Sequence, residues 1–374
     1  MIIYILFIFI GIIGLGYAVV KIHPTFGGKQ SKEKMELFAQ SPQYQKGKFI
    51  NLNRNEWDTS FGSMLSMIRE FLKSKVERKP RTPLSIVPYS PGIDRSNSAR
   101  VTWFGHSAFM LEVEGKTILF DPMFGKAPTP FPIKNQRYSR KLPFKIEDLP
   151  AIDAVVLSHD HYDHLDYGSI MNMKEKVKQF ITPLGVGSHL ARWGIPEEKI
   201  SEHDWWNEYT FEGLKLACTP ARHFSGRGLA DRNSTLWCSW VIIARDTKIY
   251  FSGDGGYGSH FKEIGEKYGP FDLTLMECGQ YDVRWADIHM LPEETVQAHQ
   301  DVKGKLLIPV HWGAFTLSLH AWHDPIERAV RAAEESGVEI ATPRIGETVI
   351  VGEDQFPDLA WWRTESYRVF NDET

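Results

Sequence analysis

Cysteine is scarce in this sequence, and so is any excess of charge. Its three cysteines, Cys218, Cys238 and Cys278, lie singly inside apolar runs. Their number and spacing exclude a disulfide framework and a cysteine-based zinc finger, and predict buried free thiols. A formal net charge of −4 over 374 residues provides no basic footprint for nucleic acid, so no nucleic-acid partner is expected.

Charged side chains are also missing from residues 1–20, which are almost wholly apolar. A helix of this length would cross the ~30 Å hydrocarbon layer, so the stretch is predicted to be a single-pass anchor in the cell membrane. The alternative is a cleaved signal peptide, which the missing N-terminal Lys or Arg and the missing cleavage site disfavour. By the positive-inside rule, the catalytic body is expected in the cytoplasm because four lysines follow the anchor: Lys21, Lys29, Lys32 and Lys34.

Residues 21–100 are predicted to be a lead-in to the main domain, 101–374. Within the lead-in, apolar residues recur at helical spacing over 61–72, which predicts an amphipathic helix. Its apolar stripe is expected to pack on the domain, the alternative being that it rests on a bilayer surface. Four prolines between 80 and 91 indicate an extended passage after it.

From residue 100 onward the pattern becomes rich in strands. Strands are predicted at 101–104, 108–113, 117–120, 155–157, 214–219, 236–244, 248–252, 306–310 and 348–351. Helices are predicted at 167–180, 186–193, 292–301 and 324–336. Two batches of strands with helices between them predict an α+β fold in which helices cover two sheets.

Potential metal-binding side chains are most concentrated in the segment SHDHYDH at 158–164, directly after a predicted buried strand. Four potential metal ligands fall within six residues: His159, His161, Asp163 and His164. Imidazole and carboxylate together suit zinc, with iron and manganese as competitors. A polar turn with surface histidines is the alternative, which this density disfavours.

Three later residues can complete a metal site, and each follows a predicted strand. They are His223, Asp254 and His311, and glycines flank Asp254 so that backbone can approach an ion closely. A lone histidine at a strand end is more often structural. The shared placement of the three residues favours a metal role instead.

These residues together resemble the ligand pattern of the metallo-β-lactamase superfamily. The resemblance implies a four-layered αβ/βα sandwich with two metal ions at its edge. It implies that His159, His161 and His223 hold one metal, that Asp163, His164 and His311 hold the other, and that Asp254 bridges both. Two zinc ions per chain are therefore expected, with iron or manganese as alternatives, and they would lower the pKa of a water held between them. Asp163 and Asp254 are the expected catalytic carboxylates.

Further segments resemble the N-acylphosphatidylethanolamine-hydrolysing phospholipase D family. They are NSTLWCSW at 233–240, FSGDGGY at 251–257, GPFD at 269–272 and HWG at 311–313. The likeness extends from about Phe49 to Val351 and is densest over 154–315. This resemblance implies cleavage of the phosphodiester on the headgroup side, giving phosphatidic acid and an N-acylethanolamine. It also implies that Tyr162 and His289 contact substrate near the phosphate.

The expected function is therefore that of a membrane-anchored, zinc-dependent phosphodiesterase with a phospholipid substrate and a membrane as partners, and a homodimer is left open. The 13% aromatic content agrees with a lipid-facing groove. Three alternatives are a lactonase or ester hydrolase of a small phosphorylated substrate, a nuclease, and a silent scaffold. The acidic balance disfavours the nuclease, and the complete ligand set disfavours the scaffold. His106 is interpreted as closing a turn, the alternative being that it supports the metal site.

Overall fold

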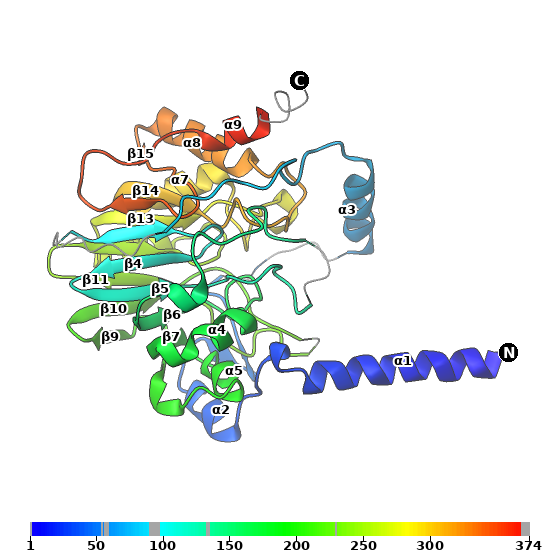
Figure 1. The fold of residues 1–374 in the computed structure, drawn as a ribbon. Coiled ribbons are helices and arrows are strands. Elements are labelled where there is room, and N and C mark those ends of the chain that lie inside the picture. Colours follow the sequence, from blue (N-terminus) through cyan, green and yellow to red (C-terminus); the bar gives the residue numbers. More distant parts are fainter. Residues whose placement is uncertain are drawn as a thin grey trace.

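Two seven-stranded sheets stack face to face in the computed structural model, which describes residues 2–53, 55, 60–89, 98–131, 135–228 and 230–367 (Figure 1). In spatial order, the first sheet contains β16 (Thr348–Ile350), β3 (Arg100–Trp103), β4 (Phe109–Val113), β5 (Lys116–Phe120), β6 (Ile152–Val156), β7 (Val177–Pro183) and β8 (Ile200–His203). The second contains β15 (Glu339–Ile340), β14 (Gly304–Val310), β13 (Phe271–Glu277), β12 (Lys248–Phe251), β11 (Ser239–Ile243), β10 (Leu214–Thr219) and β9 (Glu208–Phe211).

Helices cover the outer face of each sheet. Side chains of α4 (Tyr167–Met173) and α5 (Gly187–Arg192) pack on the first sheet. Those of α6 (His260–Lys267), α7 (Pro292–Asp301) and α8 (Asp324–Ser336) pack on the second. The other elements are α1 (Ile2–Ile22), α2 (Lys32–Phe38), a hairpin of β1 (Tyr44–Gln45) and β2 (Lys48–Phe49), α3 (Phe61–Lys73) and α9 (Trp361–Tyr367).

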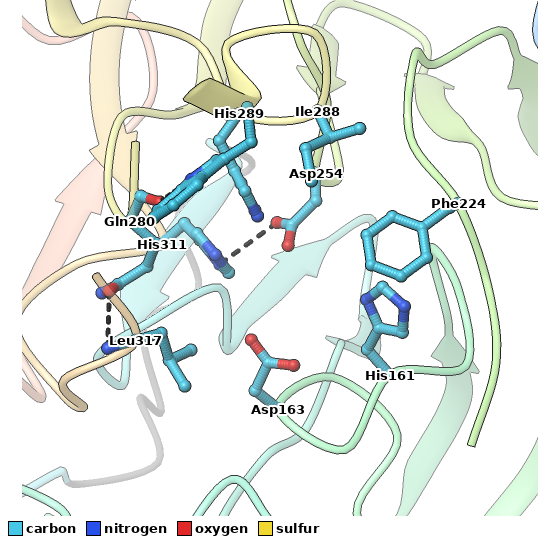
Figure 2. Close-up of a pocket in the computed structure, with 10 residues that line it drawn as sticks. His161, Asp163, Phe224, Asp254, Gln280, Ile288, His289, His311 and Leu317 are labelled. Carbon is cyan, nitrogen blue, oxygen red and sulfur yellow. Dashed lines mark hydrogen bonds and ion pairs between the residues drawn. The ribbon is translucent and has the colours of Figure 1, made fainter. Parts of the chain in front are cut away.

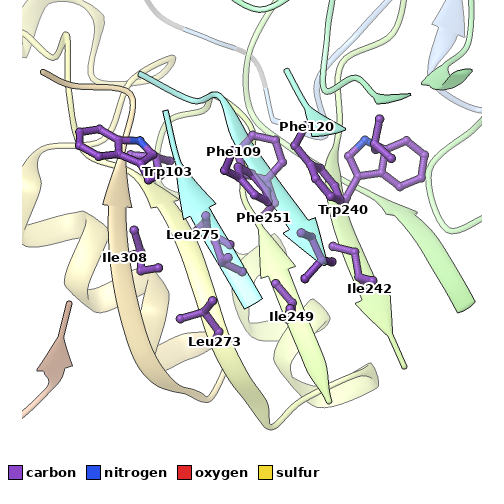
Figure 3. Packing of buried hydrophobic residues seen from close by; sticks show 14 of the residues in the cluster. Trp103, Phe109, Phe120, Trp240, Ile242, Ile249, Phe251, Leu273, Leu275 and Ile308 are labelled. Atoms are coloured by element: carbon purple, nitrogen blue, oxygen red, sulfur yellow. The ribbon is translucent and has the colours of Figure 1, made fainter. Parts of the chain in front are cut away.

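The alternation of side chains along each buried strand creates this layering. On β6, Ala154 and Val156 belong to the core between the sheets, whereas Val155 between them belongs to the core under the helices. The inter-sheet core is aromatic: Phe109 and Phe120 stack with their centroids 4.5 Å apart, and Phe251 of the opposite sheet meets Phe109 edge-on at 5.1 Å (Figure 3). The predicted four-layered sandwich is confirmed.

The strand directions bring four loops to one edge of the sandwich. Strands β12, β13 and β14 are parallel. Strand β11 is antiparallel to both β10 and β12, so β10 points the same way as β12. In the first sheet β5, β6 and β7 are parallel. Because ligands collect at the carboxyl ends of such strands, this edge is where a site is expected.

Some predicted elements differ from the observed ones. The helix predicted over 167–180 ends at Met173, and Val177 begins β7, which pairs with both β6 and β8. Burial of Phe180 and Ile181 in the centre of the sheet overrides the local helical pattern. Strands β8, β9 and β13 and helix α6 have no counterpart in the prediction. The three cysteines are buried and free, as predicted.

The predicted membrane-spanning anchor over residues 1–20 is not supported. The chain forms α1 there, projecting away from the sandwich (Figure 1). Among the described residues, however, no helix combines the length and the apolar character needed to cross a bilayer. The cytoplasmic placement inferred from the flanking lysines depended on this anchor and loses its support.

The amphipathic helix is present, but its apolar stripe does not pack on the domain. Helix α3 stands away from the sheets (Figure 1), and four residues of the stripe are exposed: Met64, Ile68, Phe71 and Leu72. Other parts of the lead-in do contact the sandwich. The guanidinium of buried Arg227 donates two hydrogen bonds to the carbonyl of Thr25, and the backbone N–H of Gly28 donates to His189.

Candidate metal centre

Three predicted ligands from two loops meet at the sandwich edge. His159 and His161 follow β6, and His223 follows β10. Nε2 of His159 lies 2.9 Å from Nδ1 of His161, which lies 3.2 Å from Nε2 of His223. A single point can therefore be reached by three imidazole nitrogens, as a tripodal zinc site requires.

A second group of ligands lies beside the first, and Asp254 joins them. Asp254 Oδ2 lies 3.0 Å from His164 Nε2 and 3.9 Å from His159 Nε2, and Asp254 Oδ1 lies 3.1 Å from His311 Nδ1. Asp163 Oδ2 is 3.5 Å from His164 Nε2. The structure thus brings all seven predicted ligands together, with Asp254 between the two groups.

Glycine lets the loop after β12 pass close to the neighbouring strand. Gly253 has φ +58, and a Cβ at this position would lie 2.5 Å from the carbonyl oxygen of Cys238. Any other residue would displace the loop. Gly253 therefore fixes the position of Asp254 in the site.

Buried partners orient the histidines through the ring nitrogens that face away from the site. The carboxylate of Asp121 lies 2.7 Å from Nδ1 of His164 and accepts a hydrogen bond from the Ser158 backbone N–H at 2.7 Å. The Ser158 hydroxyl lies 2.9 Å from Nδ1 of His159. Nδ1 of His223 lies 2.9 Å from the carbonyl oxygen of Ile288 and donates to it. Metal-binding histidines are held in this way, which leaves Nε2 for the ion.

His106 supports the site as well as forming a turn, although the turn alone was the favoured interpretation. It is fully buried with φ 57, and its Nε2 lies 2.8 Å from Asp163 Oδ2. Its carbonyl oxygen accepts the backbone N–H of His311. One residue between β3 and β4 therefore holds Asp163 and the loop after β14.

Asn51 of the lead-in and Glu277 at the end of β13 also hold the site, and the sequence alone did not single them out. Asn51 Oδ1 accepts the backbone N–H of His223 at 3.1 Å, and Asn51 Nδ2 donates to the His223 carbonyl at 2.7 Å. The buried Glu277 carboxyl accepts the Met290 N–H at 2.7 Å, and its other oxygen lies 3.3 Å from Nδ1 of His289. The signal that could have identified Asn51 and Glu277 in the sequence is that each is a polar residue with apolar neighbours.

The electrostatics match a place for cations. Burial lowers the pKa of His159, His223 and His311 well below the usual histidine value, so these rings are neutral, as metal ligands must be. Burial also opposes charge on His164, but Asp254, Asp163 and Asp121 outweigh it and raise the pKa of His164 well above the usual value. The negative charge that retains this proton is the charge that a cation would neutralise.

Buried polar atoms without partners also indicate that metal ions fit the residues present. Among the described residues, His164 Nε2, Asp254 Oδ1 and His311 Nε2 are buried and form no hydrogen bond. Leaving such atoms unsatisfied is costly, and a metal ion would satisfy all three. The donor set of imidazoles and carboxylates suits zinc, iron or manganese.

A cavity of about 260 Å³ opens above these residues. His161, Asp163, Asp254, His289 and His311 face it (Figure 2). The rest of its wall is Phe224, Gln280, Trp285, Ile288 and Leu317. No Lys or Arg occurs among the described residues of this wall, which is apolar apart from Gln280 and surrounds a polar, metal-binding floor.

The two residues expected to contact substrate lie in different places. His289 lines the cavity and stacks on His311 with centroids 5.1 Å apart. Tyr162 is not part of the cavity wall: its hydroxyl donates to the Arg227 carbonyl, and the Arg227 guanidinium lies over its ring. Contact with substrate stays a prediction for both residues.

Comparison with known proteins agrees with this geometry. The model of a family described as a beta-lactamase superfamily domain matches residues 116–312. An uncharacterised protein of Mycobacterium tuberculosis is 42% identical over 333 residues, covering 87% of this chain and 89% of that protein. The N-acyl-phosphatidylethanolamine-hydrolyzing phospholipase D 1 of Caenorhabditis elegans is 34% identical over 251 residues, covering 63% of this chain and 70% of that protein.

The fold is shared with a solved structure too. Igni18, a metallo hydrolase from the archaeon Ignicoccus hospitalis, superposes with a TM-score of 0.52 at 23% sequence identity. The superposition covers 69% of this chain and all of that chain. Similarity at this level concerns the fold alone. With the family match and the assembled histidine and aspartate ligands, it leads to one conclusion: the chain belongs to the β-lactamase superfamily and is a metal-dependent hydrolase with phospholipase D relatives.

Proposed function

We propose that this protein is a zinc-dependent phosphodiesterase that hydrolyses N-acylphosphatidylethanolamine-type phospholipids to N-acylethanolamine and phosphatidic acid. The observation that carries the proposal is the apolar cavity wall directly above a complete set of ligands for two metals. The named activity of the Caenorhabditis elegans relative supports the same substrate class. A small, strongly charged substrate would favour basic side chains around the metals, and the described wall has none.

The residues on the floor of the cavity would bind the metals, and those of its wall would surround the substrate. Two bound divalent cations would supply an acidified water and charge neutralisation for the phosphate. Two contacts fix the positions of the metal-binding side chains: Asp163 contacts His106, and Asp254 contacts His311. The apolar side chains Trp285 and Leu317 exclude bulk water from the reacting phosphate, which strengthens each electrostatic interaction there.

His289 is suited to handle the proton of the leaving group. Its Nδ1 is turned toward Glu277, which leaves Nε2 free to exchange a proton in the cavity. In hydrolysis, the oxygen of water bonds to phosphorus while the bond from phosphorus to the ethanolamine oxygen breaks. The departing alkoxide takes a proton, and we assign its delivery to His289.

The direct test is hydrolysis of N-acylphosphatidylethanolamine in mixed micelles by the zinc-loaded protein, with both products followed by mass spectrometry. Asp254→Asn should abolish turnover, whereas Asp246→Asn, at an exposed turn away from the cavity, should retain it. Protein that carries two metals and releases neither product would overturn the phospholipid substrate. Turnover that persists in Asp254→Asn would overturn the assigned site.

A further inference from the structure

Helix α3 presents an apolar face to solvent. Met64, Ile68, Phe71 and Leu72 recur at the spacing of one helical face and are 46%, 48%, 55% and 74% exposed. An apolar face of this kind is normally buried against another surface. Among the described residues, the Arg78 guanidinium lies over the Phe71 ring at 4.5 Å, and the four side chains nevertheless stay exposed.

The exposed position of α3 is fixed by specific contacts. The Ser60 hydroxyl caps its N-terminus by accepting the Ser63 N–H. At its C-terminus, the guanidinium of Arg78 donates to the carbonyl oxygens of Phe71 and Glu70. The Glu70 carboxylate also forms an ion pair with Arg284 at 2.9 Å. The helix is thus held in place while its apolar face points outward.

A basic cleft continues from the C-terminal end of α3. It has a volume of about 1050 Å³ and begins at Phe71. Its exposed cations include Lys75, Lys79 and Arg140, none of which forms an ion pair with a described residue. Glu77 is the carboxylate among the residues of its wall, and it pairs with Arg81. The cleft therefore carries a net positive charge next to an apolar helix face.

The helix face and the cleft adjoin the cavity of the metal centre. Thr316 lines the basic cleft, and the next residue, Leu317, lines the metal cavity. On the other side, Arg284 is paired with α3, and the next residue, Trp285, lines the metal cavity. A surface docked on α3 and the cleft would lie at the mouth of the active site.

We propose that the apolar face of α3 and the basic cleft together dock on an anionic lipid bilayer. The apolar side chains would enter the boundary between headgroups and acyl chains, while Lys75, Lys79 and Arg140 would face negatively charged headgroups. This inference rests on the proposed function, because a phospholipid substrate is presented by a bilayer. The charge beside the helix distinguishes a bilayer from a second copy of this chain, whose own cleft is equally positive.

The test uses the full-length, zinc-loaded protein and a fluorophore placed on α3. Because the three native cysteines are buried, Leu72→Cys provides a selectively reactive thiol for an environment-sensitive label. Glu266→Cys on the outer helix α6 is the matched control position. The probes are vesicles of phosphatidylcholine with or without phosphatidylglycerol, neither of which is the proposed substrate.

We expect the label at position 72, but not at position 266, to shift to shorter wavelength when phosphatidylglycerol vesicles are added. Raising the salt concentration, or combining Lys75→Glu with Lys79→Glu, should weaken this binding at least about tenfold, whereas Lys262→Glu on α6 should not change it. The proposal would be overturned if the label at position 72 showed no shift with phosphatidylglycerol vesicles. It would also be overturned if the shift were equally large with neutral vesicles, or equally large in the charge-reversed protein. A shift that depends on protein concentration without vesicles would assign the face to a homodimer instead.

The outcomes separate docking from catalysis. Protein that hydrolyses the substrate in micelles but shows no shift at position 72 contradicts the docking face alone. Protein that docks but produces no N-acylethanolamine contradicts the proposed reaction alone.

Discussion

The Asp121 carboxylate lies 2.7 Å from Nδ1 of His164, and both side chains are fully buried. The same carboxylate accepts the Ser158 hydroxyl at 2.5 Å, and that hydroxyl lies 2.9 Å from Nδ1 of His159. One carboxylate therefore orients histidines that belong to the two different ligand groups.

Asp121→Asn should weaken metal binding. The amide retains the size of the side chain but lacks the negative charge that holds the His164 ring in its orientation, and losses of about 10- to 100-fold in affinity are typical for such partners. Competition with a zinc-binding dye measures the effect. Exposed Asp354→Asn serves as the control, and an affinity equal to that of the control would contradict the role of Asp121.

His106→Phe should lower the occupancy of one metal position more than the other. The ring keeps its packing against Phe315 but loses the contact between Nε2 and Asp163 at 2.8 Å. Elemental analysis after dialysis should give about one metal per chain, because the position that includes Asp163 is weakened while the cluster of His159, His161 and His223 is left intact. Retention of the full metal content would show that His106 only closes the turn.

Glu277→Gln should reduce kcat by about tenfold with little change in KM, because Glu277 positions His289, which is assigned a proton transfer in the transition state. The amide oxygen can still accept the Met290 N–H, so the loop is preserved. Glu294→Gln is the matched control, since it alters another carboxyl of this region that bonds the Leu291 N–H and does not touch His289. An equal rise in KM for both variants would indicate a general disturbance of the loop.

Removal of metal should destabilise the protein. The buried carboxylates and imidazoles of the site then face one another without a cation, and a ligand present at about 1,000 times its Kd stabilises a fold by about 4 kcal/mol. Differential scanning calorimetry should show a lower Tm after chelation and recovery when zinc is added back. Asp254→Asn should show a smaller shift between the two states, and an equal shift would place the bound metal elsewhere.

Acid should destabilise the fold through His203, which is not one of the predicted metal ligands. Burial lowers the pKa of His203 from 6.5 to about 4. Between these values the unfolded chain binds a proton that the folded chain does not, so this contribution is fully present above pH 6.5 and is lost as the pH falls toward about 4. The loss is at most about 3 kcal/mol.

Urea unfolding at several pH values checks this expectation. His203→Gln should flatten the pH dependence of the unfolding free energy over that window, whereas Thr210→Val, at an exposed position of the adjoining strand β9, should not. A slope unchanged in His203→Gln would assign the acid sensitivity to other groups.

The local sequence was sufficient wherever the signal was short in range. The strand before residue 158 and the ligands just after it are neighbours in the chain, so their spacing alone predicts a metal loop. His223, Asp254 and His311 could be predicted because each follows a strand, and strands that point the same way end at one edge of the sandwich. The alternation of apolar residues likewise predicted two sheets covered by helices.

Tertiary structure decided what depends on distant contacts. Asp121 and His164 are 43 residues apart, and Asn51 and His223 are 172 apart, so no local pattern could reveal either pair. The segment Val177–Pro183 is a strand rather than a helix because its backbone pairs with β6 on one side and with β8 on the other. The sequence determined that α3 is amphipathic, but only the packing of the whole chain decided that its apolar face would be left open to solvent, because an amphipathic pattern specifies a face without specifying what covers it.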